Sequence, residues 1–441
     1  MFKKLTALLL LAVLLCGCTQ TAPQPTTPPT EAPPAFALTV EGEAANDKPV
    51  TAKVPDGVGE ITGYQWYLDG VAIAGAVNQT LHIPTAAGGK ALKVRAYTAD
   101  AYGESEEITV KDIPNDTRTF AGLYHEAKML GRCNIYGTAV SSDWSGGGFE
   151  IRLKLDKADV TLNYKLSAHQ YMVLFVDGVQ VQRFNMNKNQ ESIKLPVPAG
   201  EHTVMLVKDS ETRTDNFSMD LVSLTFSGQV LERPADKPYY IEVIGDSISC
   251  GDGALGKYEY GKSWTAADHS ATNSFSWFAA QMLNADYSIV GKGGIGLITQ
   301  AGPMNMIELY KYINGYRDET VYKPTRIPDI VVVELSGNDK KHGDAAFKKE
   351  LDKMYDQIRA LYGKDVHIIW LGRNEGQYAA AQQIAQERKD TDPNLHAVFF
   401  SYGGSGSAAQ KTQTSGHPNS AEQKELADAL VKYIQDNKLI G

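Results

Sequence analysis

Continuous apolar runs in the second half of the chain place the tightest limit on its fold. Residues 239–244, 330–335 and 367–371 are each largely apolar. Strands that are buried on both faces require runs of this kind. Because helical stretches separate the runs, we expect residues 237–441 to form an α/β domain built on a doubly wound parallel sheet.

The first of these expected strands ends in a serine. The stretch "YYIEVIGDSISCGDG", residues 239–253, leads from apolar residues through Gly245 and Asp246 to Ser247. In open α/β sheets the carboxyl ends of the strands face the ligand crevice, so a hydroxyl group at this position is presented to a substrate. Ser247 is therefore a candidate nucleophile.

Groups that could stabilise an oxyanion follow two other strands. Asn338 lies in "LSGND" (335–339), directly after an apolar run, and "IVGKGGIG" (289–296) offers backbone N–H groups in a glycine-rich turn. A tetrahedral acyl intermediate needs an amide side chain or backbone N–H groups around its oxyanion. Taken singly, a turn-forming asparagine and an ordinary tight turn explain these motifs equally well.

A histidine near the C-terminus is the candidate general base. Of the nine histidines, His417 alone lies on an expected loop before the last helix, from which it can reach over the carboxyl edge of the sheet. Pro418 interrupts regular structure after it, and we expect Ser420 and Gln423 to form the capping box of the helix. A surface histidine with no catalytic part is the alternative.

These motifs, in this order, resemble those of the SGNH hydrolases, the GDSL-like esterase superfamily. The resemblance is greater to carbohydrate esterases of family 2, which place a jelly-roll domain directly before the SGNH domain, and it covers about residues 117–441. It implies that Ser247 is the nucleophile of an acyl-transfer reaction and that His417 is its general base.

The same resemblance implies an oxyanion hole. Asn338 would donate to the oxyanion together with the backbone of Ser247 and the glycine of the second motif. That glycine is expected to be Gly291, which follows its strand directly. Gly293 is the second choice, because "VGKGG" lacks the serine that usually precedes the glycine.

The chain departs from the family pattern beside the histidine. The superfamily usually has an acid two or three residues before it, where this chain has Thr414 and Ser415, and no Asp or Glu occurs from Pro393 to Ala421. The resemblance then implies a Ser-His dyad, in which a backbone carbonyl or a distant side chain orients His417. Catalysis survives such a loss, since the nucleophile and the oxyanion donors supply much of it.

Two β-rich regions precede the α/β domain. Residues 36–113 alternate apolar and polar positions, with a hairpin expected at Asp69-Gly70 and Trp66 in the core; they resemble an immunoglobulin-like sandwich, a spacer or a sugar binder. Residues 117–235 contain many short strands, as in "GGFEIRLKLD", and predict a jelly-roll domain.

The N-terminus predicts export. Residues 1–18 have two lysines, an apolar run and small residues, as in a signal peptide, and "LCGC" resembles a bacterial lipobox that would make Cys18 a lipidated residue. Cleavage by the ordinary signal peptidase is the alternative. Residues 19–35, rich in Pro and Thr, are expected to form an extended, semi-rigid tether that holds the catalytic body away from the cell envelope.

Composition and cysteine usage exclude several classes of protein. With a net charge of −9 and no long basic run, nucleic acid is not an expected partner. Cys133 and Cys250 are far apart and are expected to be small buried residues without a disulfide. No metal-ligand spacing occurs, so neither a metal nor another cofactor is expected.

The function expected from these features is that of a secreted esterase on the bacterial cell surface. It would remove acetyl groups from plant polysaccharides or oligosaccharides, where the short acyl group and the sugar are implied by the family resemblance. A lysophospholipase or thioesterase is the alternative among enzymes. A glycan-binding lipoprotein without catalysis is the alternative from another class.

Overall fold

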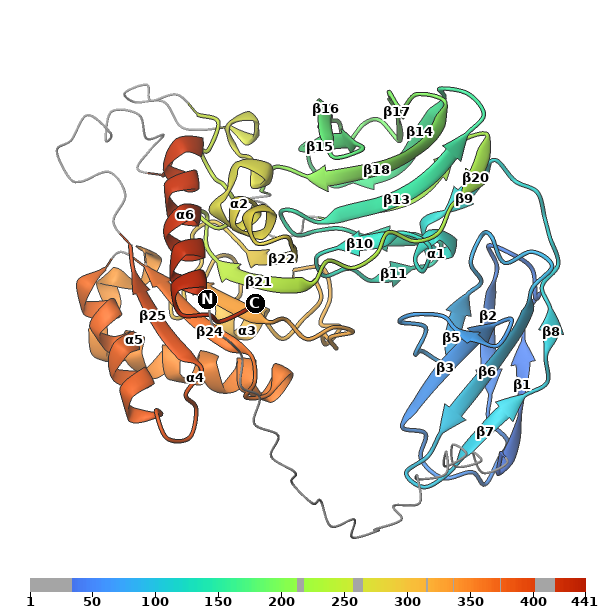
Figure 1. Ribbon diagram of the computed structural model, residues 1–441, viewed down its shortest axis with the longest axis horizontal. Coiled ribbons are helices and arrows are strands. Elements are labelled where there is room, and N and C mark those ends of the chain that lie inside the picture. Colours follow the sequence, from blue (N-terminus) through green and yellow to red (C-terminus); the bar gives the residue numbers. More distant parts are fainter. Residues whose placement is uncertain are drawn as a thin grey trace, which may run out of the picture.

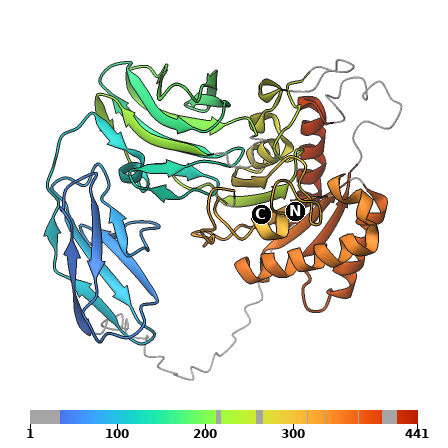
Figure 2. The same cartoon turned by 180° about the vertical axis from the view of Figure 1, so that it is seen from behind.

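The computed structural model shows three consecutive bodies (Figure 1). It describes residues 34–211, 218–256, 265–314, 316–335, 337–372, 374–400 and 417–441. The expected signal peptide, Cys18 and nearly all of the tether lie outside these residues. Figure 2, the view from behind, shows the first β domain beside the second, which in turn lies against the α/β domain.

The first body is a β-sandwich with eight strands joined in the order β4-β3-β6-β7-β1-β2-β5, with β8 on β6. The strands are β1 (Phe36–Glu41), β2 (Pro49–Lys53), β3 (Gly63–Leu68), β4 (Val71–Ala72), β5 (Thr80–His82), β6 (Ala91–Tyr97), β7 (Tyr102–Ser105) and β8 (Ile108–Thr109). Trp66 is fully buried. Asp69 and Gly70 both have positive φ, as the two-residue turn between β3 and β4 requires. The expected hairpin and core aromatic are confirmed.

The second body packs two six-stranded sheets face to face, in the orders β10-β13-β18-β15-β16 and β11-β12-β19-β14-β17, with β20 on β13 and β9 on β19. Its elements are β9 (Thr117–Thr119), α1 (Phe120–Leu123), β10 (Lys128–Leu130), β11 (Ile135–Tyr136), β12 (Ala139–Ser141), β13 (Gly148–Leu155), β14 (Val160–Leu166), β15 (Gln170–Val176), β16 (Val179–Met186), β17 (Ser192–Leu195), β18 (Gly200–Lys208), β19 (Met219–Thr225) and β20 (Gly228–Val230). Alternate residues of β13, from Phe149 to Leu155, fill the core between the sheets.

The third body contains a parallel sheet of five strands in the order β22-β21-β23-β24-β25. The strands are β21 (Tyr239–Gly245), β22 (Ala285–Gly291), β23 (Ile330–Glu334), β24 (His367–Gly372) and β25 (Leu395–Phe399). The chain starts at β21, adds β22 on one side and then continues with β23 on the other. Such a reversal creates a crevice at the carboxyl ends of β21 and β23, where ligands bind in open α/β sheets.

Helices cover both faces of this sheet. They are α2 (Phe275–Met282), α3 (Met306–Leu309), α4 (Asp344–Tyr362), α5 (Glu375–Glu387) and α6 (Ser420–Asp436). Val331 and Val333 pack on the side of α3, α4 and α5, whereas Ile330 and Val332 pack on the side of α2 and α6. The doubly wound architecture is thus confirmed. Within the described ranges, no helix is long and apolar enough to cross a membrane.

Helix α5 was not expected from the sequence. Its residues "EGQYAAAQQIAQE" include few large apolar side chains, and its buried apolar face consists of Ala380, Ala381 and Ile384. A face this small gives only a weak helical period. The sequence pattern of this segment does not predict a helix. The packing of α5 against α4 and β25 shows its place in the fold.

The seam between the first and second bodies is polar. Glu126 of the second body accepts hydrogen bonds from the backbone N–H groups of Thr85 (3.0 Å) and Ala86 (2.7 Å). Asp47 of the first body accepts one from the backbone of Thr119 (3.0 Å). Water is partly excluded from this seam, and the burial raises the pKa of Glu126. Two carboxylates and the backbone of the opposite domain hold these bodies together.

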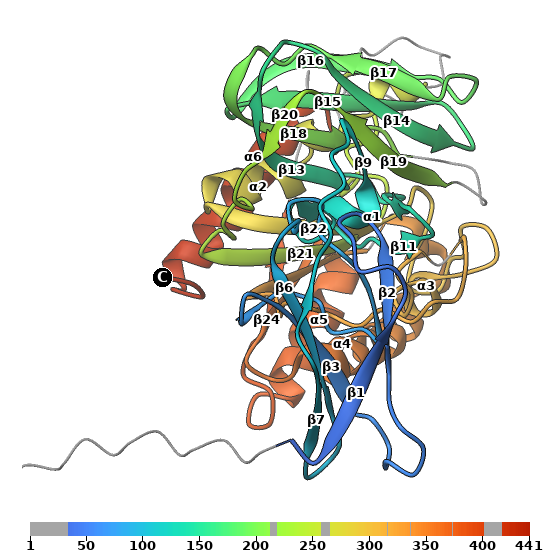
Figure 3. The same cartoon turned by 90° about the vertical axis from the view of Figure 1, so that its right-hand side faces the viewer.

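The seam between the second and third bodies contains an apolar cluster. Val173 and Phe175 from β15 pack with Trp277 of α2 and Tyr287 of β22 in one buried cluster, and the rings of Phe175 and Trp277 are stacked at 5.5 Å. Figure 3 shows the jelly-roll strands beside β21 and β22. The jelly roll therefore covers the side of the sheet on which β22 would otherwise be an open edge.

A buried ion pair lies in the same seam. Arg132, which follows β10, contacts the carboxylate of Glu242 on the interior strand β21 at 3.2 Å, and both side chains are fully buried. Removing one partner of such a pair leaves the other charge buried and uncompensated. We expect Arg132→Met to lower the free energy of unfolding by about 3–5 kcal/mol, measured by chemical denaturation.

An exposed pair provides the control for this prediction. Lys154 and Glu201 are 3.6 Å apart, and both side chains are more than half exposed. We expect Lys154→Met to change stability by less than about 1 kcal/mol, as exposed pairs contribute little. Equal effects of the two substitutions would contradict a central part for the buried pair.

Candidate active site

Ser247 and His417 meet at the carboxyl edge of the parallel sheet. Ser247 follows β21 by two residues and is 7% exposed. Its Oγ lies 2.6 Å from Nε2 of His417, which is half-buried. The structure thus brings the expected nucleophile and base, 170 positions apart in the sequence, within hydrogen-bonding distance. A nucleophile beside a base is the arrangement that acyl transfer requires.

The turn after β21, residues 246–252, is called here the nucleophile turn, and it fixes Ser247 through its backbone. The C=O of Ser247 accepts a hydrogen bond from the N–H of Asp252 (2.9 Å), and Oδ1 of Asp246 accepts one from Ile248 (2.9 Å). Ser249 donates to the buried Glu334 of β23 (2.9 Å) and packs against Gly245, where any Cβ would collide with it. This tight turn therefore places the hydroxyl of Ser247 with little freedom.

His417 is positioned by the start of α6, although not through the expected cap. The capping box is formed by Asn419 and Glu422, so the prediction of Ser420 and Gln423 was wrong by one position. Gln423 is instead fully buried, where its side chain accepts from the N–H of Phe275 (2.8 Å) and donates to the C=O of Ile248 (3.0 Å). It ties α6 to both α2 and the nucleophile turn.

Asn338 lies in the 3-10 helix η3 (Gly337–His342), directly after β23, and is half-buried. Its Nδ2 donates to Oδ2 of Asp246 (3.1 Å) and to the C=O of Ile295 (2.8 Å). Both amide hydrogens thus have acceptors, so a substrate oxyanion would have to replace one of them. The position fits an oxyanion donor, and the role stays a prediction.

The two candidate glycines differ in their surroundings. Gly291 is the last residue of β22, and a Cβ there would lie 2.8 Å from Sγ of Cys250, which explains why only glycine fits. The N–H of Gly293 donates to the carboxylate of Glu211 and is therefore already engaged. This contact favours Gly291 over Gly293, but its role as a donor also stays a prediction.

Asp339 holds the glycine-rich segment against the crevice. It is fully buried and accepts hydrogen bonds from the N–H groups of Leu297 (2.6 Å), Ile298 (3.2 Å) and Thr299 (2.8 Å). The acid that follows Asn338 in the sequence therefore shapes a loop. Thr414 and Ser415, the positions where the family usually has its acid, lie outside the described residues.

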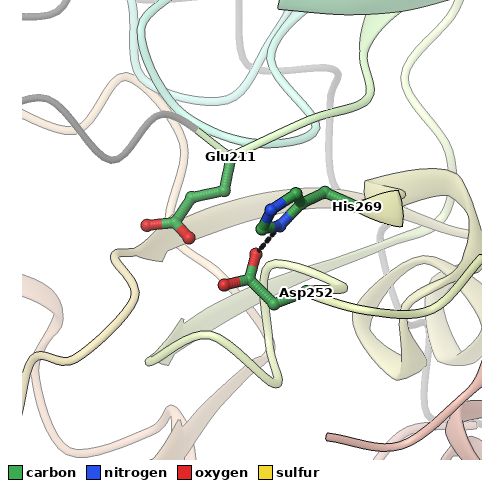
Figure 4. A group of neighbouring side chains, drawn as sticks. All are labelled: Glu211, Asp252 and His269. Carbon is green, nitrogen blue, oxygen red and sulfur yellow. Dashed lines mark hydrogen bonds and ion pairs between the residues drawn. The ribbon is translucent and has the colours of Figure 1, made fainter. Parts of the chain in front are cut away.

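Sequence reasoning missed a second polar cluster beside the nucleophile turn. Glu211, Asp252 and His269 are all buried and face one another (Figure 4). Burial and the neighbouring Asp252 raise the pKa of Glu211 to about 8. The three residues lie in two different domains, and no motif connects them, so no pattern in the sequence indicated the cluster.

The cysteines carry no disulfide in the described part of the chain. Cys250 is fully buried, as expected, whereas Cys133 is only half-buried; both are free thiols. Burial raises the pKa of Cys133 to about 11, so its thiol stays protonated at neutral pH.

Comparison with known proteins identifies the family of the second body. The model of the family described as carbohydrate esterase 2 N-terminal matches residues 129–234. The cellulase/esterase CelE of Acetivibrio thermocellus is 28% identical over 234 residues, which is 51% of this chain. The chain spans only 28% of the length of that relative.

Solved structures of family 2 carbohydrate esterases share the fold. One from Clostridium thermocellum, in complex with cellohexaose, has a TM-score of 0.63 and 22% identity, covering 70% of this chain and 98% of its own. An acetyl xylan esterase from the rumen bacterium Butyrivibrio proteoclasticus has a TM-score of 0.63 and 16% identity, covering 71% and 95%. The resemblance found in the sequence and the expected fold class are therefore confirmed.

The geometry predicts that Ser247 is reactive towards a fluorophosphonate probe. We expect Ser247→Ala to abolish labelling, and His417→Ala to slow it at least about 100-fold, because the general base would be missing. Labelling is measured by mass spectrometry of the intact protein.

A second histidine at the same sheet edge is the control. Nε2 of His342 contacts the hydroxyl of Thr299 (3.1 Å), and its side chain is exposed. We expect His342→Ala to label at the wild-type rate. Labelling that persists in Ser247→Ala, or an equal loss in both histidine variants, would refute the proposed pair.

Proposed function

We propose that this protein is a serine esterase that removes O-acetyl groups from plant polysaccharides or oligosaccharides. The observation that carries the proposal is the distance of 2.6 Å between Oγ of Ser247 and Nε2 of His417. The pair lies where the order of the parallel strands reverses, beside an amide side chain. This is the place in such folds where ligands bind.

The proposed reaction has two halves. Oγ of Ser247 attacks the ester carbonyl while Nε2 of His417 takes its proton, and the oxyanion accepts hydrogen bonds from Asn338 and nearby backbone N–H groups. The tetrahedral intermediate collapses as its bond to the sugar oxygen breaks. This oxygen takes the proton from His417 and leaves as the sugar hydroxyl, while the acetyl group stays on Oγ of Ser247. Water, activated by the same histidine, then releases acetate and restores Ser247.

His417 acts without an acid from its own loop in this proposal. No Asp or Glu occurs from Pro393 to Ala421, so an acceptor other than a carboxylate from that segment orients the imidazole. The anchoring of α6 by Gln423 limits the movement of His417, which lies three residues before this helix. The restricted position of His417 then supplies part of the orientation that the acid of a Ser-His-Asp triad supplies in other hydrolases.

The sugar substrate is supported by the relatives. The Clostridium structure contains cellohexaose, and the Butyrivibrio protein is an acetyl xylan esterase. Both share the fold of this chain, and the matched family domain precedes the α/β domain here as well. Hydrolysis of long-chain acyl substrates, as by a lysophospholipase or thioesterase, would contradict the proposal.

Acetate release from acetylated xylan and glucomannan tests the activity. We expect measurable release by the wild type, and a loss of at least about 100-fold in both Ser247→Ala and His417→Ala. Asp344→Asn is the control, because Asp344 is an exposed acid at the start of α4, and it should retain at least half of the activity.

Three outcomes would contradict this proposal. Binding of the same polysaccharides without acetate release would indicate a glycan-binding protein. Faster hydrolysis of long acyl chains than of acetyl esters would indicate a lipid esterase. A loss in Asp344→Asn as deep as that in His417→Ala, in a folded protein, would reveal a triad acid and refute the dyad.

We also propose that the protein is a lipoprotein attached to the bacterial cell surface. The motif "LCGC" and the tether of Pro and Thr after it support this location. We expect Cys18→Ser to move the protein from the detergent phase to the aqueous phase in Triton X-114 partitioning.

Cys16 provides a matched control for this substitution. It lies two residues before Cys18 in the same motif, and Cys16→Ser leaves the thiol of Cys18 in place. The variant should partition like the wild type. Partitioning of Cys18→Ser with the wild type would exclude lipid attachment at Cys18.

A further inference from the structure

The cluster of Glu211, Asp252 and His269 joins two domains. Glu211 follows β18 of the jelly roll, Asp252 lies in the turn after Ser247, and His269 follows the 3-10 helix η1 (Ala266–Asp268). All three are at least nine-tenths buried. One nitrogen or oxygen atom from each lies within 4.8 Å of the others. Figure 4 shows the two carboxyl groups and the imidazole turned toward one another.

One oxygen of Glu211 has no hydrogen-bond donor among the described residues. Its Oε1 accepts from the N–H of Gly293, whereas Oε2 is buried and faces the carboxyl group of Asp252. Two carboxyl groups can bond to each other only through a shared proton or a cation. A buried polar atom without a partner is costly, and among the described residues a shared proton or a cation between the two carboxyl groups would remove this cost.

The carboxyl groups of Glu211 and Asp252 fit beside Gly293 because this residue has no side chain. A Cβ on Gly293 would lie 2.8 Å from Oε2 of Glu211 and 3.2 Å from Oδ2 of Asp252. Gly293 does not have positive φ, unlike Gly294, so backbone conformation does not demand a glycine at 293. The position stays without a side chain because the carboxyl groups occupy that space.

We propose that Glu211, Asp252 and His269 bind one divalent transition-metal ion, such as Zn²⁺. Carboxylate oxygens and an imidazole nitrogen form a donor set that suits this class of ion. Ligand atoms around an ion at about 2.0–2.2 Å lie about 3–4 Å apart, and one candidate ligand atom from each of the three residues lies within 4.8 Å of the other two.

Charge balance supports an ion of charge +2. Nδ1 of His269 is hydrogen-bonded to Oδ1 of Asp252 in the structure. A divalent ion with a neutral imidazole would replace this hydrogen bond and neutralise the two carboxylates, which otherwise repel each other. Lys208, the buried cation nearby, contributes at most one positive charge, and burial lowers its pKa to about 8. The N–H of Gly293 fixes the carboxylate of Glu211 from outside, as groups behind metal ligands commonly do.

The ion would be structural, since the chemistry proposed above assigns every step to Ser247, His417 and the oxyanion donors. The N–H of Asp252 holds the C=O of Ser247 at 2.9 Å, and Glu211 holds the glycine turn. Binding would therefore fasten the jelly roll to the two loops that frame the nucleophile. The inference does not depend on the proposed esterase activity, because its test measures metal content and stability.

The test uses the whole secreted part of the chain, purified, stripped with a chelator and titrated with Zn²⁺. We expect one ion per chain by elemental mass spectrometry after desalting. At free Zn²⁺ of 100 times the dissociation constant, the melting temperature should rise by about 5 °C or more. Glu211→Gln and Asp252→Asn should each lose the stoichiometric ion and this rise.

His202→Gln is the control for adventitious binding. Nδ1 of His202 lies 2.7 Å from Asp177, so this surface pair offers the same two ligand types without the third. The variant should keep one ion per chain. If the wild type binds no stoichiometric ion and Glu211→Gln is as stable as the wild type, the carboxyl groups share a proton and the proposal is overturned. Loss of the ion in His202→Gln would also overturn it.

Discussion

The buried carboxylate of Glu242 is the constraint on which the third domain depends. It lies in the middle of β21, the strand that leads to Ser247, and Tyr310 (2.5 Å) and Tyr362 (3.1 Å) donate to it from inside the same domain. Its cationic partner within the described residues, Arg132, comes from the jelly roll and stacks on Tyr310 at 4.3 Å. A charge taken from water costs several kcal/mol unless it is paired. The strand that leads to Ser247 is therefore completed by another domain.

The dependence extends from the strand to the site. The same seam carries the stacked Phe175 and Trp277, and Trp277 lies on α2, whose first residue is bound by Gln423 of α6. The loop with His417 precedes α6. The position of the base relative to the nucleophile thus follows from packing between domains, and not from the residues next to it in the sequence.

The sequence predicted what local patterns control. Apolar runs gave the parallel sheet, Asp69-Gly70 gave a hairpin with positive φ at both positions, and the residues after β21 and β23 were placed at one edge of the sheet. Ser247 and His417 could be proposed because strand ends and loops before helices have recognisable neighbours. Their contact at 2.6 Å needed the structure.

The features that the sequence did not predict depend on distant partners. Helix α5 has a small apolar face, and its place in the fold follows from its packing against α4 and β25. The cap at Asn419 differs from the expected one because Gln423 is drawn into the core by contacts with α2 and the nucleophile turn. Glu211 and His269 belong to segments with no common motif, so their meeting follows from the domain seam alone.

The two domain seams differ in how easily recombination between genes could exchange the domains that they join. The first sandwich is held through Glu126 and Asp47, largely by the backbone of the opposite domain, which any sequence provides. Gene fusion can therefore exchange that module at small cost. The second seam joins an apolar cluster and specific ion pairs, such as Arg132 with Glu242 and Arg317 with Asp220. Crossovers between divergent genes at residue 236 would therefore separate partners that evolved together. Natural recombinants should carry the jelly roll and the parallel sheet as a single heritable block.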